Sequence, residues 1–112
     1  MGSVAQRIEQ VRAEGRAALV GYLPVGYPTV EGSVEAMRAM VAGGVDVVEI
    51  GLPYSDPLMD GPVIQRATQQ ALDNGARSRD AFTAVRAVVG AGAPALVMTY
   101  WNLIDRYGIE RF

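Results

Sequence analysis

Apolar residues occur along this chain in two patterns, short continuous runs and stretches with helical spacing. The continuous runs span residues 17–23, 45–50 and 95–100. Short apolar runs bounded by turn-forming residues are typical of strands buried on both faces of a parallel sheet. The sequence therefore predicts three such strands. The first is expected to end before Pro24, because proline cannot donate to the ladder of a sheet.

Apolar residues at helical spacing fill the intervals between these runs. The first predicted helix opens with Ser3 and Gln6 at the spacing of a capping box, and it should cover the bottom of the sheet. Thr29 is the predicted N-cap of the second helix, and Pro62 opens the third because a first-turn position needs no N–H. The predicted helices span residues 3–14, 29–42, 62–74 and 78–89, and another opens within 102–112. The predicted buried face of the fourth consists of Phe82, Val85 and either Val88 or Val89.

This order of elements, helix, β, α, β, α, α, β, requires a parallel sheet with right-handed crossovers. Two architectures fit it. One is a doubly wound sheet, and the other is the first three strands of an eight-stranded (β/α) barrel, which has about 250 residues when complete. The pattern alone does not choose between them. An open sheet of three strands leaves unpaired edges, so the chain is expected to self-associate or swap elements.

The composition and net charge of the chain argue against some classes of function. The chain has 112 residues, 50% hydrophobic content and a net charge of -2, which predicts a single soluble domain over residues 1–112. This charge gives no support to binding of nucleic acid or of a membrane surface. We find neither an apolar run of about 18 residues nor a charged-then-apolar leader, so a cytoplasmic protein is expected.

Three residue types are missing from the chain, which has no Cys and no His and whose ten basic residues are all Arg. Within this chain, their absence excludes a nucleophilic Cys, a Ser–His pair, a Schiff-base lysine and a His/Cys zinc site. Carboxylates are the main groups left for proton transfer. No cofactor and no metal are predicted, although a hard divalent metal held by Glu49, Asp56 and Asp60 is an alternative.

These three acids belong to one stretch that runs from the second predicted strand to the third helix. Glu49 lies at the C-terminal end of the strand, where α/β enzymes place catalytic groups, and it could exchange protons near neutral pH. The alternative is a solvated acid or one paired with an arginine. Asp60 precedes the helix that opens at Pro62, so its alternative role is to cap that helix.

Three segments carry a family resemblance. Residues 49–62 read EIGLPYSDPLMDGP, residues 21–28 read GYLPVGYP and residues 98–102 read MTYWN. Together they resemble the signature of the tryptophan synthase alpha subunit family, which cleaves indole-3-glycerol phosphate to indole and glyceraldehyde 3-phosphate. The resemblance extends over nearly the whole chain, and it implies the N-terminal part of a (β/α)₈ barrel with about three of its strands.

The resemblance also implies residue roles. Glu49 would relay protons to indole C3 and from the side-chain hydroxyl, and Asp60 would accept a hydrogen bond from the indole N1–H. The implied indole pocket, for which plain core packing is the alternative, contains Tyr22, Met98 and Tyr100. The implied contact surface for the tryptophan synthase beta subunit, otherwise an ordinary turn, contains Pro53, Asp56, Pro57 and Asn102. Strand alternation predicts that Thr99 and Trp101 face the outer helices instead.

The sequence also departs from the family. Family members often have Thr at the position of Pro24 and Asp at that of Tyr27, and their phosphate site uses glycine-rich loops after later strands, which this chain does not contain. The chain alone is therefore expected to turn over little or no substrate. A second hypothesis is a non-catalytic half-barrel that binds a partner subunit or itself.

Overall fold

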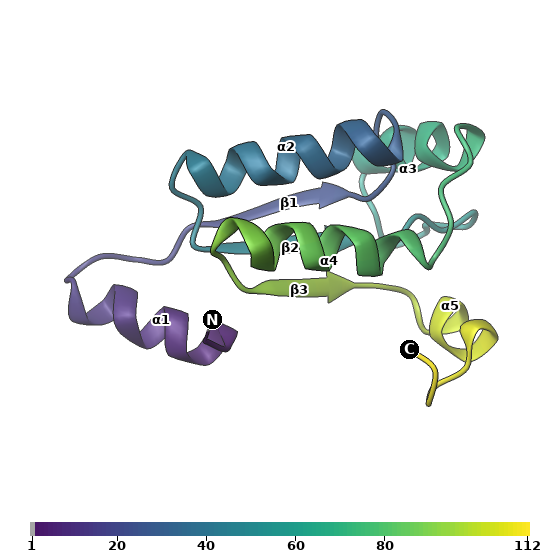
Figure 1. Cartoon of the computed structure of the whole chain (residues 1–112). Helices are drawn as coiled ribbons and strands as arrows, with labels where there is room; N and C mark the ends of the chain where they lie inside the picture. Colours follow the sequence, from purple (N-terminus) through teal and green to yellow (C-terminus); the bar gives the residue numbers. More distant parts are fainter. Residues whose placement is uncertain (1) are drawn as a thin grey trace.

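The computed structural model describes residues 2–112 and contains one parallel sheet with helices around it (Figure 1). The strands, hydrogen-bonded in chain order, are β1 (Val20–Pro24), β2 (Val47–Gly51) and β3 (Ala95–Met98). The helices are α1 (Val4–Ala13), α2 (Val30–Ala42), α3 (Pro62–Asp73), α4 (Asp80–Ala91) and α5 (Trp101–Tyr107). Both strand pairs are parallel. The predicted α/β fold with a parallel sheet is confirmed.

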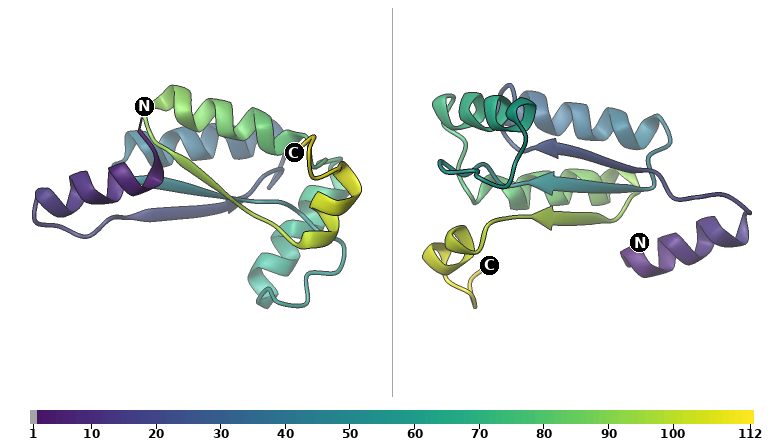
Figure 2. Two further views of the ribbon diagram at one scale, coloured as in Figure 1. Left: turned by 90° about the horizontal axis from the view of Figure 1, so that it is seen from below. Right: turned by 180° about the vertical axis from the view of Figure 1, so that it is seen from behind.

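Only one face of this sheet is covered by helices. Helices α2 and α4 pack against each other and lie over it, whereas α1 lies toward the N-terminal ends of the strands and α3 and α5 toward the C-terminal ends (Figures 1 and 2). The core between the helices and the sheet is formed by Val25, Val34, Met37, Val48, Ile50, Ala84, Val88 and Ala93. The opposite face of the sheet has no helical layer in residues 2–112.

Strand register determines which side chains share the uncovered face. Tyr22 is paired with Glu49, and Glu49 with Leu96, so these three side chains form one row across the sheet. The neighbouring positions Val48 and Ile50 are fully buried under the helices. In a closed barrel the uncovered face would be the interior.

The helix starts follow the predicted local chemistry. The Ser3 hydroxyl accepts a hydrogen bond from the Gln6 N–H at 3.2 Å, and the Gln6 side chain accepts one from the Ser3 N–H at 2.8 Å. The Thr29 hydroxyl accepts the Gly32 N–H at 3.0 Å, and Pro62 occupies the first turn of α3. These contacts satisfy N–H groups that the first turn of a helix leaves unpaired.

Two predicted strand ends were wrong. Pro24 belongs to β1 as its last residue, because the Val25 N–H donates to Gly51 O at 2.9 Å and the nitrogen of Pro24 therefore points to the open edge. The third strand stops at Met98 rather than Tyr100, which instead precedes the first turn of α5. Helix α4 continues through Gly90 and ends at Gly92, whose φ of 112° suits glycine.

The predicted buried face of α4 was only partly right. Val88 is fully buried and Val85 packs against the core while partly exposed, as predicted. The fully buried companions of Val88 are the small residues Ala81 and Ala84, which allow α4 to approach α2 closely. Phe82 instead contacts the end of the chain, with its ring centroid 5.1 Å from that of Phe112. Phe82, which helical spacing assigned to the core, thus packs against an aromatic residue at the C-terminal end of the chain.

Asp46 joins the N-terminal part of the chain to the start of β2. Its fully buried carboxylate accepts hydrogen bonds from Arg7 at 3.0 Å, from Arg16 at 2.9 and 3.0 Å, and from the Leu19 N–H at 2.8 Å. The bonds from Arg16 and Leu19 hold the pKa of this carboxyl well below its usual range. Asp46 was not among the residues predicted to matter, although an acid at the start of an apolar strand was a signal for it.

We expect Asp46→Asn to lower the urea midpoint of the chain at neutral pH, because the amide cannot balance the charge of two arginines. Since the folded pKa is depressed, the contribution of Asp46 is complete above its unfolded pKa of about 3.9 and is lost as pH falls toward the lower folded value. The difference between the two midpoints should therefore be full at pH 7 and should shrink progressively as pH is lowered from about 4 toward the folded pKa. Urea titrations over this pH range test this, and equal midpoints at pH 7 would contradict it.

The uncovered face and the open edges predict self-association of the 112-residue chain. Leu96 and Met98 are 44% and 55% exposed on that face, and β1 and β3 each have one unpaired edge within the described residues. Light scattering at micromolar concentrations should give a mass above the 11.9 kDa of one chain. A mass equal to one chain under these conditions would refute the prediction.

Candidate functional site

A cavity of about 510 Å³ opens where the C-terminal ends of the strands meet the uncovered face. Its lining comes from all three strands, from the loop after β2 and from the starts of α3 and α5. The lining residues are Tyr22, Glu49, Leu52, Met59, Asp60, Ile64, Met98, Thr99, Tyr100 and Trp101. The C-terminal edge of a parallel sheet is the common site of catalysis in α/β proteins. Both candidate acids and all three candidate pocket residues line this one cavity.

Glu49 is carried into the cavity by β2. Its side chain lies between those of Tyr22 and Leu96 and is half-buried. Gly51, two residues further on, leaves room for the Tyr22 ring, because a Cβ at Gly51 would overlap the phenol oxygen and lie 2.8 Å from Tyr22 Cζ. The glycine after the acid therefore lets an aromatic ring lie across the strand beside the carboxylate.

The Tyr22 phenol reports the electrostatics of the cavity. Burial raises its pKa to about 12, and the negative charges of Asp60 and Glu49 add to that rise. Both carboxylates thus lie near enough to one hydroxyl to oppose its ionisation. This is consistent with the position of both acids in the cavity lining.

Asp60 enters the cavity from the loop between β2 and α3. The N-cap of α3 is Gly61, and no side chain caps this helix, so the Asp60 carboxylate is not used as a helix cap. The Asp60 N–H donates to Pro57 O at 3.0 Å, and the Gln65 side chain donates to the Asp60 carbonyl at 2.8 Å. The loop holds the Asp60 backbone and leaves its carboxylate to the cavity.

Tyr100 contacts the same loop from the opposite side of the cavity. Its hydroxyl accepts the Met59 N–H at 3.0 Å, and its ring centroid lies 5.0 Å from that of Tyr54. Asn102 in turn donates to the Tyr54 hydroxyl at 2.9 Å. Met59, Tyr54 and Gln65 were missed at the sequence level, because their contacts depend on how the loop folds back.

Thr99 and Trp101 do not face the outer helices, as strand alternation had predicted, but line the cavity with Met98 and Tyr100. Strand β3 ends at Met98, so the alternation of side chains no longer applies to the residues that follow. Trp101 is 62% exposed and opens α5. The rim of the cavity is therefore more aromatic than predicted.

The four residues assigned to a partner surface differ in exposure. Asp56 and Asn102 are exposed, Pro57 is half-buried and Pro53 is buried. Two neighbours on the loop, Leu58 and Met59, expose 80% and 89% of their surface. The loop thus presents apolar side chains beside an acid.

The metal hypothesis for the three acids finds no support in the geometry. Within residues 2–112, no three side chains of metal-ligating type lie close enough together to hold an ion. Glu49 and Asp60 share the cavity, whereas Asp56 is exposed on the loop and does not line it.

Among residues 2–112, no helix has the length and apolar character needed to cross a membrane.

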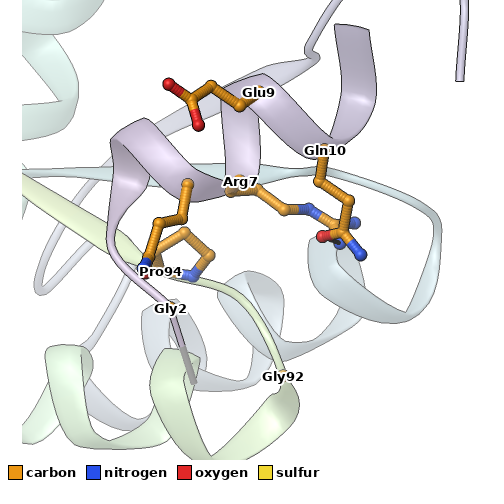
Figure 3. Close-up of a pocket in the computed structure, with 7 residues that line it drawn as sticks. Gly2, Arg7, Glu9, Gln10, Gly92 and Pro94 are labelled. Atoms are coloured by element: carbon orange, nitrogen blue, oxygen red, sulfur yellow. Dashed lines mark hydrogen bonds between the residues drawn. The ribbon is translucent and has the colours of Figure 1, made fainter. Parts of the chain in front are cut away.

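A second hollow, of about 630 Å³, lies beside α1 near the N-terminal end of β3 (Figure 3). Its lining includes Arg7, Glu9, Gln10 and Pro94, and none of the candidate site residues. It lies away from the ends of the strands that carry Glu49. The paired acids therefore single out the cavity at the C-terminal ends as the candidate active site.

The parallel sheet and the position of the cavity define a class of protein, the α/β proteins with side chains for chemistry at the C-terminal ends of their strands. A family model described as "Tryptophan synthase alpha chain" matches residues 8–112. The chain belongs to the tryptophan synthase alpha chain family.

Individual relatives agree with this membership. The chain is 55% identical over its whole length to the tryptophan synthase alpha chain of Salinispora tropica, of which it covers 42%. It is 60% identical over 104 residues to that of Mycobacterium marinum, of which it covers 39%. A solved structure of Mycobacterium tuberculosis tryptophan synthase superposes on the whole chain with a TM-score of 0.95 at 53% identity, over 44% of the solved chain.

The chain thus spans less than half the length of these relatives. Its three strands correspond to part of a (β/α)₈ barrel, which decides between the two architectures that the sequence pattern left open.

Proposed function

We propose that this chain is the N-terminal part of a lyase that cleaves indole-3-glycerol phosphate to indole and glyceraldehyde 3-phosphate in tryptophan biosynthesis. The observation that carries the proposal is the meeting of Glu49 and Asp60 at one cavity around Tyr22. Membership of the tryptophan synthase alpha chain family supports it independently.

The reaction is a retro-aldol cleavage in which the indole ring accepts the electrons. Protonation of indole C3 gives an iminium-like indolenine, and removal of the proton from the adjacent side-chain hydroxyl then breaks the carbon–carbon bond. The bonding electrons return to the ring, which leaves as indole, and the hydroxyl carbon becomes the aldehyde. Glu49 donates the first proton and accepts the second, as one carboxyl group that acts as acid and then as base.

Asp60 stabilises the charge that develops during this step. Protonation at C3 places positive charge on the ring nitrogen, and a carboxylate that accepts the N1–H lowers the energy of that state more than that of neutral substrate. No lysine is present in the chain to form an iminium with the substrate. The protonated indole ring, stabilised at its nitrogen by Asp60, accepts the electrons in place of a lysine iminium.

The ring itself is held by apolar and aromatic side chains. Tyr22 and Met98 lie on the uncovered sheet face on either side of β2, and Tyr100 closes the cavity at its rim. Leu52 and Ile64 add apolar surface from the loop and from α3. A cavity lined largely by apolar and aromatic side chains, with two carboxylates, suits an indole ring that needs polar contacts at C3 and N1.

We also propose that the loop after β2 and the start of α5 form the contact with the tryptophan synthase beta subunit. Asp56 and Asn102 are exposed, and Pro53 and Pro57 stiffen the loop that carries Asp56. The same loop carries the cavity residues Met59 and Asp60, and Asn102 directly follows the cavity residue Trp101. An interface there would let indole pass directly to a partner.

The second candidate is a non-catalytic half-barrel that binds itself or a partner subunit. The uncovered sheet face, with Leu96 and Met98 exposed, favours this for the chain on its own. The two functions differ in whether turnover depends on Glu49.

The test uses a completed chain, defined as residues 1–112 of this sequence joined to the remaining C-terminal part of the Salinispora tropica relative. We expect the completed chain to release indole from indole-3-glycerol phosphate, measured by indole absorbance or fluorescence, with no added cofactor. The control carries the relative's own N-terminal part. If the control is active and the completed, folded chain releases no indole, the proposed function is wrong.

A further inference from the structure

We infer that Tyr100 is a positioning residue for Asp60, which it places through the backbone of Met59. The inference rests on the proposed function and assigns Tyr100 a task beyond lining the cavity. The Tyr100 hydroxyl accepts the N–H of Met59, the residue directly before Asp60, at 3.0 Å. This bond joins positions 41 residues apart in the chain. It links the end of β3 to the loop that carries the acid.

Bonds on both sides of Asp60 hold its backbone. On the α3 side, the Gln65 side chain donates to the carbonyl of Asp60 at 2.8 Å and to that of Pro57 at 3.3 Å. Toward β3, the only described bond to the Met59–Asp60 segment is the one from the Met59 N–H to Tyr100. The Met59 side chain is 89% exposed and adds little packing. Without the Tyr100 hydroxyl, the peptide before Asp60 has no anchor toward β3.

Tyr100 is itself fixed in place. Its ring packs against Tyr54 with centroids 5.0 Å apart, and the Tyr54 hydroxyl accepts a bond from Asn102 at 2.9 Å. Tyr54 belongs to the loop after β2, and Asn102 belongs to α5. The ring contact and the Asn102 bond therefore join these two segments in addition to the bond between Tyr100 and Met59. A hydroxyl on a ring held in this way fixes the Met59 peptide better than a mobile side chain would.

The position of Asp60 matters because its charge must meet one atom of the substrate. A displacement of about 1 Å can cost a large factor in rate when a group acts on a developing charge. The effect of Tyr100 should therefore appear in the chemical step and should depend on the presence of the Asp60 carboxylate. Direct action of the hydroxyl on the substrate would not show that dependence.

Tyr100→Phe in the completed chain tests this inference, since phenylalanine keeps the ring and its contact with Tyr54. We expect kcat to fall about tenfold, the effect of one positioning hydrogen bond, with KM changed less than about twofold. Hydrogen exchange of residues 58–60 should become faster, which is a readout that needs no turnover. Tyr107→Phe is the matched control, because Tyr107 packs against Phe82 away from the cavity, and its kcat should stay at the parent value.

The double variant separates positioning from direct action. In the Asp60→Asn background, Tyr100→Phe should change kcat less than about twofold, because a residue that acts through Asp60 has nothing left to place. A full tenfold loss in that background, or an unchanged kcat and exchange rate in Tyr100→Phe alone, would overturn the inference. A parent chain without activity would instead refute the proposed function, while the exchange measurement would still test the contact.

Discussion

Replacing Glu49 by Gln in the completed chain is expected to reduce kcat for indole release by about 1000-fold or more. A single general acid or base contributes about 10²–10⁴ in rate, and Glu49 is assigned both proton transfers in one turnover. Glutamine has nearly the same size and keeps polar contacts, but it cannot release a proton. KM should stay within a few-fold of the parent value, because the ring is bound by the surrounding aromatic and apolar side chains.

The matched control for this variant is Glu31→Gln. Glu31 lies exposed in the first turn of α2, outside the cavity, and its replacement should leave kcat unchanged. Steady-state measurement of indole release gives both constants. If Glu49→Gln keeps more than about a tenth of the parent kcat, the carboxyl group does not carry the proton transfers and its assignment fails.

Asp60→Asn is expected to lower kcat by about 100-fold, since removal of one group that stabilises a developing charge typically costs about 10²–10³. The amide oxygen can still accept the indole N–H but lacks the negative charge. Tyr22 offers an independent readout. Because Asp60 contributes to raising its pKa to about 12, the variant should bring that pKa closer to its usual value of about 10.

The control for Asp60→Asn is Asp105→Asn, which changes an exposed acid on α5 outside the cavity lining. It should alter neither kcat nor the titration of Tyr22. Indole release and the ultraviolet titration of tyrosine follow the two effects separately. A kcat within about threefold of the parent in Asp60→Asn would show that the charge on Asp60 is not used.

Local chemistry explains what the sequence could predict. The capping box at Ser3, the N-cap at Thr29 and the first-turn Pro62 are each decided by contacts within a few residues. The placement of Glu49 in β2, two residues before the last residue Gly51, follows from one apolar run and the glycine that closes it, although the predicted position at the very end of the strand was two residues off. Such features are specified by neighbouring residues, so they need no knowledge of the tertiary fold.

Long-range contacts explain what the sequence could not predict. Pro24 remains in β1 because that strand is at an edge, and Thr99 and Trp101 face the cavity because β3 stops early. The bond between Tyr100 and Met59 depends on a loop whose path no pattern describes. Asp46 pairs with Arg7 across 39 positions. In the last two cases a partner distant in the chain decides the outcome, and in the first two it is the place of the strand in the sheet or the length of the strand.

The features of the candidate site also fall into those that the sequence predicted and those that depend on the folded structure. The roles of Glu49 and Asp60 come from the family resemblance, but their common cavity and joint effect on Tyr22 come from the folded arrangement. The residues that hold the Asp60 loop, above all Gln65, had no sequence signal apart from their position near it. Residue types indicated the chemistry, and tertiary contacts determined which groups can act together.

The most direct test of the account is a crystal structure of the completed Glu49→Gln chain with indole-3-glycerol phosphate, which this slow variant should retain intact. We predict the indole ring between Tyr22 and Tyr100, with its N1–H within hydrogen-bond distance of the Asp60 carboxylate and its C3 next to residue 49. Substrate bound with its ring outside this cavity, or with N1 and C3 turned away from both positions, would contradict the account.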